Sequence, residues 1–388
     1  MKELIEHYIL TNEERKYFGL EPILPQWERH EVKEGFIVYF DGDVIRKTIS
    51  VNTLLGADYE YMESDNEIYT REHNVVLPRT EKGKEKKLNF TSINGMNPTG
   101  CTFRMNIAHP YRKSSLWAGN TRNSISLPVD FPDDIKTFTE YRSWLNTFIV
   151  NIPADYFDKV KRMKNTPHRT VKYYNGDIFR FEADLEHYGF GLIIGQMRKM
   201  KKDGLLSKEH ILYTTMGVAL LVRLYKLKSA QKDIDIDKLT SYPLGDTFIM
   251  MDNQVIWGAY DIVGSKKLSQ NDINFPIQTG KSIDARDPDY VRLCWGTGII
   301  LRRNVKDFPD SLINHKIMRN GSRIGVGKID LERTLESKEN CETNDLEKRA
   351  FQYFGVPFNM TFDEFNRQNN GLTAKEYADY ANKSGRVK

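Results

Sequence analysis

Short runs of β-forming residues, each closed by turn residues, fill much of the N-terminal third of this chain. The run Gly35–Phe40 is followed by Asp41-Gly42, a dipeptide typical of hairpin turns, and Val44–Val51 supplies the return strand. Further short strands are expected at 58–62, 68–71, 74–77, 87–90 and 101–107, with Gly, Asn and Pro between them. A series of this kind predicts an antiparallel β-meander.

One amphipathic helix is expected over residues 133–150, directly after the meander. Its apolar residues recur at steps of three and four, which places them on one face: Ile135, Phe138, Tyr141, Trp144, Leu145 and Phe148. A meander closed by one such helix is similar to a pleckstrin-homology-like domain. In such a domain the basic segment Arg79–Lys87 can contact phosphates, but Glu81 and Glu85 interrupt its charge and favour a solvated hairpin.

The length of 388 residues exceeds one ordinary hydrophobic core and predicts two or three domains. A boundary is expected at Asn165–His168, because proline disfavours helix in the residue before it. The predicted domains are 1–165, the meander with its helix; 166–310, a mainly antiparallel β domain; and 311–388, a helical extension with two capping-box patterns. The predicted fold class is therefore α+β.

The second predicted domain opens with a turn at Asn175-Gly176 and a strand over 177–181. The next strand, Tyr188–Gly195, carries glycine at alternate positions, so an aromatic ring or another backbone can lie close to its bare face. Further strands are expected at 244–251, 255–264 and 291–301.

Four short motifs of this domain, taken in order, resemble the immunity protein 26 family of bacterial polymorphic-toxin systems. They lie within roughly residues 173–303 and read Gly176-Asp177-Ile178-Phe179, Tyr188-Gly189-Phe190-Gly191, Trp257-Gly258 and Trp295-Gly296-Thr297-Gly298. The resemblance implies an α+β domain that binds a cognate toxin in the cytoplasm of the producing cell. Some relatives carry a phosphotriesterase label, but the resemblance supplies no catalytic residues for this chain.

Composition excludes several classes of protein. The chain has 57 basic and 53 acidic residues, and this near balance is not that of a nucleic-acid binder. No apolar run approaches the roughly 20 residues of a membrane-spanning helix. Three scattered cysteines argue against a disulfide framework, and residues 1–7 lack the basic start and apolar centre of a signal peptide. We therefore expect a cytoplasmic protein.

Local catalytic motifs are absent from the sequence. The eight histidines form no His-x-His or His-Glu-x-x-His element, and no Gly-x-Ser-x-Gly occurs. Cys294 lies in an apolar run beside Trp295, where a thiol is usually a small buried hydrophobe. We expect no cofactor, no metal and no enzymatic activity. A metal site assembled from distant histidines and a hydrolase of the phosphotriester type are the alternatives.

The candidate partner-binding residues are basic and aromatic. Between Lys161 and Lys232 the chain carries 15 basic and 6 acidic residues, most densely at Arg198, Lys199, Lys201 and Lys202. Such a cluster attracts an acidic protein surface, whereas a solvated loop is the alternative interpretation. Trp257 and Trp295 each precede a glycine. We expect their rings to pack over bare backbone; alternatively one stays exposed as an interface anchor.

The sequence thus favours an immunity protein that binds a toxin with an acidic face and neutralises it by steric occlusion, without catalysis. The other alternative is an adaptor whose N-terminal domain binds a lipid or a peptide, with Lys84, Lys86 and Lys87 as candidate contacts.

Overall fold

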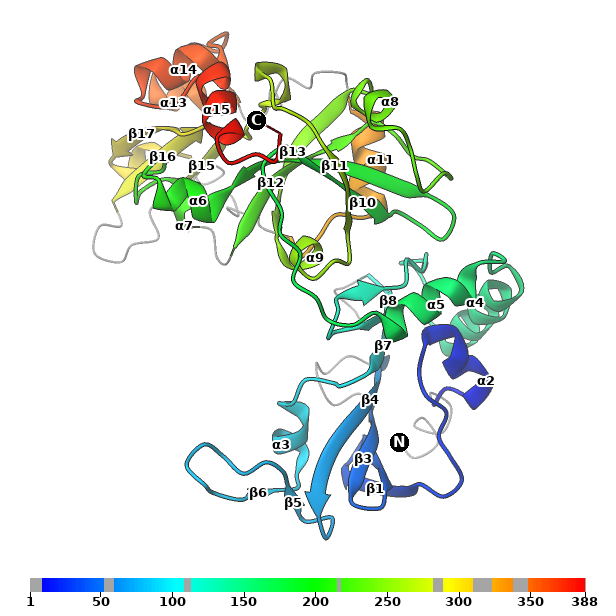
Figure 1. Cartoon of the computed structure of the whole chain (residues 1–388). Helices are drawn as coiled ribbons and strands as arrows, with labels where there is room; N and C mark the ends of the chain where they lie inside the picture. Colours follow the sequence, from blue (N-terminus) through cyan, green and yellow to red (C-terminus); the bar gives the residue numbers. More distant parts are fainter. Residues whose placement is uncertain are drawn as a thin grey trace. The chain divides into compact units, whose positions relative to one another are not determined.

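The computed structural model describes residues 9–51, 59–107, 113–214, 218–281, 289–309, 323–337 and 348–387. The chain divides into two compact units, residues 1–169 and 170–388 (Figure 1). Both units combine helices with antiparallel sheets, so the predicted α+β class is confirmed. No helix within the described ranges is both long and apolar enough to cross a membrane.

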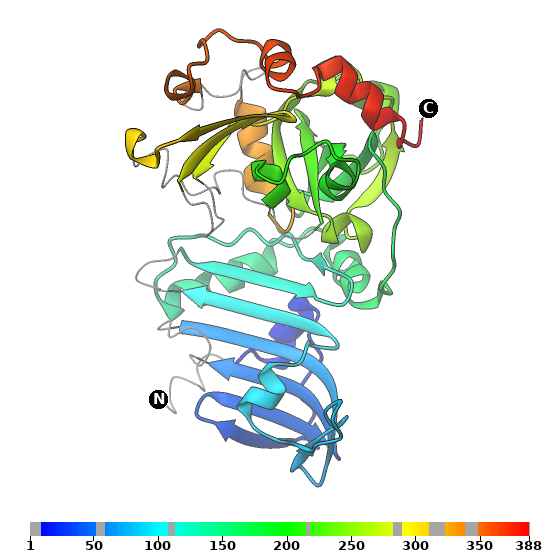
Figure 2. The same ribbon diagram turned by 90° about the vertical axis from the view of Figure 1, so that its left-hand side faces the viewer.

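The first unit is built on one antiparallel sheet with the strand order β1-β2-β3-β4-β7-β8-β9 (Figure 2). A short hairpin, β5 and β6, extends from β4. The strands are β1 Glu28–Lys33, β2 Phe36–Asp41, β3 Val44–Val51, β4 Tyr59–Arg71, β5 Val75–Val76, β6 Lys86–Lys87, β7 Cys101–Ile107, β8 Ser115–Asn120 and β9 Ile125–Ser126.

β4 is one strand of 13 residues, where two separate strands were expected at 58–62 and 68–71. Its middle residues are polar, so they lack the alternation of apolar and polar residues that predicts a strand. These polar side chains are nevertheless buried and paired: Lys47 Nζ lies 2.6 Å from Glu63 and 2.5 Å from Asp65. Burial opposes ionisation of Glu63, but Lys47 and Arg15 hold the pKa of this carboxyl below its ordinary value.

The helices of the first unit are α2 Asn12–Arg15, η1 Lys16–Phe18, α3 Phe90–Asn94, α4 Phe138–Val150 and α5 Tyr156–Asn165. The sequence Thr11-Asn12-Glu13-Glu14 predicts a capping box. This box forms, with the Thr11 hydroxyl and the Glu14 carboxylate each accepting a backbone hydrogen bond. α4 begins five residues later than expected, at a capping box made by Thr137 and Glu140. α3 was not predicted. The likeness to a pleckstrin-homology domain stays a prediction.

The second unit contains a five-stranded antiparallel sheet, ordered β13-β12-β11-β10-β14, and a three-stranded sheet, ordered β15-β16-β17. The strands are β10 Asp177–Glu182, β11 Tyr188–Gln196, β12 Ala219–Tyr225, β13 Leu244–Met251, β14 Asp261–Ser265, β15 Gln278–Lys281, β16 Tyr290–Trp295 and β17 Gly298–Arg303. Both faces of the five-stranded sheet are buried, since side chains from its strands enter two separate hydrophobic clusters.

Two expected strands of this unit differ from the structure. The segment 255–264 begins in a helix, because Gly258 at φ +73° ends α9 and the strand starts only at Asp261. The segment 291–301 is a hairpin rather than one strand, because Gly296 at φ +69° opens a two-residue turn between β16 and β17. In both places a glycine with positive φ ends one element inside a mainly apolar run.

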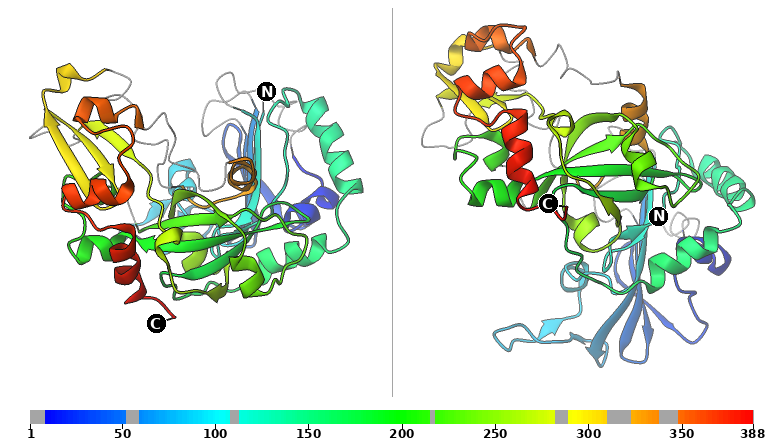
Figure 3. Two further views of the ribbon diagram at one scale, coloured as in Figure 1. Left: turned by 90° about the horizontal axis from the view of Figure 1, so that it is seen from above. Right: turned by 45° about the horizontal axis from the view of Figure 1, so that its top comes forward.

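Helices surround the two sheets of the second unit (Figure 3). They are α6 Met197–Lys202, α7 Ile211–Thr214, α8 Ile236–Thr240, α9 Asn253–Ile256, η2 Gln270–Asp272, η3 Val305–Asp307, α11 Lys328–Glu336, α13 Phe351–Phe354, α14 Phe362–Gln368 and α15 Ala374–Asn382. Of the last three, α14 contacts β16 and β17, and α15 contacts η2. The capping boxes expected at Thr361 and Thr373 start α14 and α15. Phe351, Phe365 and Tyr377 enter the same core as the central sheet.

Candidate functional site

The alternating glycines of β11 face phenylalanines of β10. Phe179 lies opposite Gly191 and Phe181 lies opposite Gly189 in the strand register. A Cβ atom at Gly191 would approach the Phe179 ring to 2.3 Å, and one at Gly189 would approach the Phe181 ring to 2.4 Å. The two phenylalanine rings therefore pack directly on the glycine backbone of this strand, and both are buried in the core.

The start of β10 is fixed by Gly176 and Asp177. Gly176 has φ +86°, and a Cβ there would lie 2.2 Å from the carbonyl oxygen of Lys266. Asp177 is fully buried; its carboxylate accepts a hydrogen bond from the Tyr174 backbone N–H at 2.9 Å and two from Arg386, at 3.0 and 2.9 Å. These residues join the C-terminal segment to the first strand of the sheet.

The remaining motif residues also shape the backbone. Tyr188 exchanges backbone hydrogen bonds with Ser229, and the Arg180 guanidinium lies 5.6 Å above the centre of its ring. Gly258 and Gly296 supply the two positive-φ turns described above. The Gly298 N–H donates to Asn366 Oδ1 at 2.9 Å, which ties the β16–β17 hairpin to α14.

The two tryptophans have different environments. Trp295 is only 6% exposed, and its indole N–H donates to the Phe275 carbonyl at 3.1 Å. It packs against rings of α13 and α14, so it cannot contact a partner without leaving the core. The proposal that Trp295 is an exposed anchor is therefore wrong. Trp257 is half-buried at the end of α9, and its role at an interface stays a prediction.

The basic cluster forms the short helix α6 rather than a loop (Figure 1). Met197 and Met200 anchor it in the core, which leaves the basic side chains toward solvent. Lys199 Nζ binds Asp203 at 2.6 Å and lies 5.5 Å above the Tyr380 ring. Lys201 Nζ lies 5.6 Å above the Tyr213 ring, and partial burial lowers its pKa.

Arg198 and Lys202 are the most available charges of α6. Both are exposed, and four residues of spacing put them on one side of the helix. Within the described part of the chain neither forms an ion pair. Elsewhere in the basic stretch the charges are partly neutralised, since Lys228 binds Asp184 at 2.7 Å and Lys164, in the first unit, binds Glu21 at 2.8 Å. Met197 and Met200, which lie three residues apart, were the available sequence signal for this helix.

Residues 174–289 match the model of the immunity protein 26 family. The matched segment contains three of the four motifs and the whole of α6, and it ends before Trp295. No curated protein and no solved structure matches the chain. The immunity protein 26 segment therefore covers the five-stranded sheet, whereas the first unit and the C-terminal helices lie outside it.

Two potentially reactive side chains in or beside the immunity protein 26 segment, Cys294 and Asp261, are buried or paired. Burial raises the pKa of the Cys294 thiol to about 12, and its sulfur accepts a hydrogen bond from the Ile211 N–H at 3.5 Å. Asp261 binds Arg180 at 2.8 Å. A thiol with this pKa is protonated at neutral pH and is a poor nucleophile.

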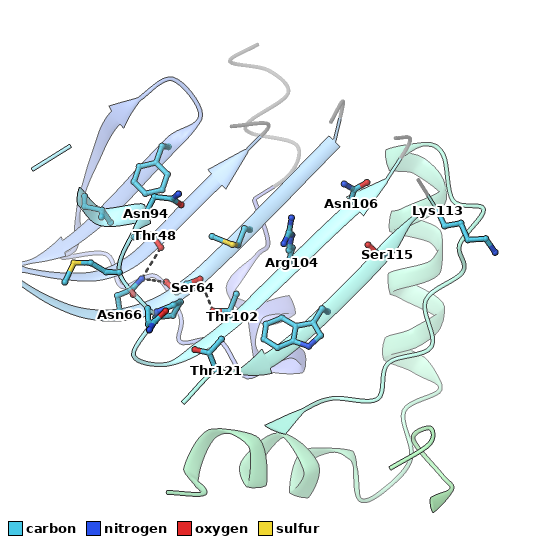
Figure 4. Close-up of a pocket in the computed structure, with 17 residues that line it drawn as sticks. Thr48, Ser64, Asn66, Asn94, Thr102, Arg104, Asn106, Lys113, Ser115 and Thr121 are labelled. Atoms are coloured by element: carbon cyan, nitrogen blue, oxygen red, sulfur yellow. Dashed lines mark hydrogen bonds between the residues drawn. The ribbon is translucent and has the colours of Figure 1, made fainter. Parts of the chain in front are cut away.

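A pocket of about 560 Å³ lies outside the immunity protein 26 segment, on one face of the first unit's sheet (Figure 4). Hydroxyl and amide groups line its floor, where Asn66 Nδ2 donates to Thr48 Oγ1 at 3.0 Å. Arg104 lies at its wall and binds the buried Glu60 at 2.5 Å. Trp117, which is 39% exposed, also lines the pocket.

This pocket was not anticipated from the sequence, because most of its lining residues come from β2, β3, β4, β7 and β8, with alternate residues of β4, β7 and β8. Its hydroxyls, amides and indole suit a polar ligand that hydrogen-bonds on one side and stacks on the other. The lipid- or peptide-binding alternative stays a prediction. Lys84, Lys86 and Lys87 do not line the pocket; they lie on and beside β6.

Proposed function

We propose that this protein is a bacterial immunity protein that binds a cognate toxin in the cytoplasm and neutralises it without catalysis. The match of residues 174–289 to the immunity protein 26 family carries this proposal. The burial of Cys294 and the pairing of Asp177 and Asp261 support a binding role, because these groups serve the fold of the second unit.

The binding surface that we propose is centred on α6. Arg198 and Lys202 point into solvent from a helix whose other face is held in the core by Met197 and Met200. A charge on a rigid element loses little conformational freedom on binding, and a basic patch speeds encounter with an acidic partner. Lys199 and Lys201 each lie above a tyrosine ring, and these lysines together with the rings extend the patch.

Steric occlusion is the mechanism that this surface supports. A stable complex buries about 1,600 Å² in total, far more than α6 alone can supply. Neighbouring surface must therefore take part, and the half-buried Trp257 is a candidate contact. The toxin would present carboxylates toward α6, and the covered face would contain or adjoin its active site.

We expect the cognate toxin to be encoded beside this gene, and co-expression with that toxin tests the proposal. Cells that carry the toxin and this protein should survive, and cells with the toxin alone should die. The double substitution Arg198→Glu and Lys202→Glu should slow association about tenfold or more and weaken protection, because like charges then face each other. Lys238→Glu, on the exposed side of α8, is the matched control and should protect normally. Death of cells that express soluble wild-type protein would contradict the proposed function.

A further inference from the structure

Three metal-ligating side chains from distant parts of the sequence meet at the edge of the first unit's sheet. Glu28 and His30 lie two residues apart on the edge strand β1, so they share one face. His73 lies in the turn between β4 and β5. One donor atom from each of the three side chains lies within 4.8 Å of the other two.

The donor atoms of the three side chains lie close to one another. His30 Nε2 lies 3.4 Å from Glu28 Oε2, and His73 Nδ1 lies 3.9 Å from the same oxygen. Separations of this size suit ligands that each sit about 2.0–2.2 Å from one tetrahedral cation. The Glu28 side chain is 67% exposed, so an ion can enter from solvent.

The His73 ring is held in the orientation that a metal ligand needs. It stacks on the buried Phe40 ring, with centroids 4.1 Å apart and planes tilted by 20°. Its Nε2 lies 2.8 Å from the Gly42 carbonyl oxygen, which can only accept a hydrogen bond. The N–H of the neutral ring therefore sits on Nε2, and the lone pair of Nδ1 points toward Glu28. A histidine whose second nitrogen donates to a carbonyl is the usual arrangement around bound metals.

One cation can accept electron pairs from these groups together. In the Nε2–H tautomer, the Nδ1 lone pair of His73 and the Glu28 carboxylate are both electron-pair donors, as metal ligands must be. His30 brings a second imidazole, whose centroid lies 5.3 Å from that of His73. We propose that Glu28, His30 and His73 form a binding site for Zn²⁺ or a similar divalent transition metal, with water completing the coordination.

Imidazole and carboxylate ligands select this class of ion. Two nitrogens and one oxygen suit Zn²⁺, whereas Mg²⁺ and Ca²⁺ favour sites built from oxygen alone. Asp43 lies 3.7 Å from His73 Nε2, on the far side of the ring, and so stands outside the ligand shell. A bound ion would clip the exposed edge strand β1 to the β4–β5 turn.

Calorimetric titration of the chelator-treated full-length protein with Zn²⁺ tests the site. We expect uptake of one ion that is weakened more than about tenfold by His30→Ala and by His73→Asn. Asparagine tolerates the positive φ of 52° at position 73, so this variant keeps the turn. His168→Ala, which removes an exposed histidine elsewhere in the first unit, should bind Zn²⁺ like the wild type.

Co²⁺ absorption and Mg²⁺ titration complete the test. Bound Co²⁺ should give visible bands that both variants lose while their circular dichroism stays that of the folded protein. Mg²⁺ should produce no comparable binding. Equal Zn²⁺ affinity in wild type and both variants would overturn the site, and so would a wild type that takes up no stoichiometric Zn²⁺. Neither result depends on protection against a toxin.

Discussion

His210 shows how burial controls a single titratable side chain. It is 0% exposed, and burial together with the nearby Arg292 guanidinium lowers the pKa of its imidazole from 6.5 to about 3. Between these two values the unfolded chain binds a proton at this residue and the folded protein does not. Proton binding to the unfolded state alone lowers stability, so the folded protein loses stability as pH falls from about 6.5 toward 3.

The free energy of unfolding should therefore fall by up to about 1.4 kcal/mol per pH unit from this residue. Urea unfolding at pH 7, 6 and 5 measures the slope, in a range above the pKa of most carboxylates. His210→Gln should flatten it, because the buried imidazole is then absent from both states. Equal slopes for wild type and His210→Gln would refute the assignment.

At the scale of elements, the β10–β11 pair depends on glycine at positions 189 and 191. Gly191→Ala places a methyl group 2.3 Å from the Phe179 ring, which is fully buried and cannot swing into solvent. Overpacking of this kind costs about 1–3 kcal/mol. Chemical denaturation should show that loss for Gly191→Ala, and adding Phe179→Leu should recover part of it because the ring is removed.

Gly327→Ala is the matched control for this strand pair. No heavy atom lies within 4 Å of a Cβ at Gly327, and its φ is ordinary, so its cost should stay below about 1 kcal/mol. If Gly191→Ala were as mild as this control, the close packing of Phe179 on β11 would be disproved.

Elements with a regular apolar pattern could be predicted, and those governed by one backbone angle or by tertiary pairing could not. β7 and β13 match their expected limits, and the capping boxes at Thr11, Thr361 and Thr373 all form. The turn at Gly296 was missed because its flanks are apolar on both sides. The middle of β4 was missed because its charges are neutralised only by side chains from other strands and from α2.

The candidate sites were harder to predict, because they are assembled by the whole fold. The α6 cluster is contiguous in sequence and could be named as basic, although its helical form and its tyrosine neighbours could not. His30 and His73 lie 43 positions apart in sequence and meet only after β1 pairs with β2 and Phe40 receives the His73 ring. Glu28-x-His30 on a strand was the available signal, but β1 itself was not predicted.

At the scale of the whole molecule, each unit has its own hydrophobic core and should fold alone. Division of the chain between Arg169 and Thr170 preserves the nearest hydrogen bonds within each unit. His168 Nδ1 contacts the Arg122 carbonyl in the first unit, and the Val171 N–H donates to Ile256 in the second. Fragments 1–169 and 170–388 should each unfold cooperatively, as circular dichroism during heating can show.

Fragment 1–165, cut at the boundary expected from sequence, should be less stable than fragment 1–169. It lacks the Thr166 carbonyl, which accepts a hydrogen bond at 2.8 Å from the buried Asn123 amide. Loss of that acceptor should cost about 1 kcal/mol, and urea unfolding of the two fragments measures it.

Fragment 170–388 should still protect cells from the toxin, whereas 1–169 should not. Protection that required both units would show that the immunity function belongs to the intact chain.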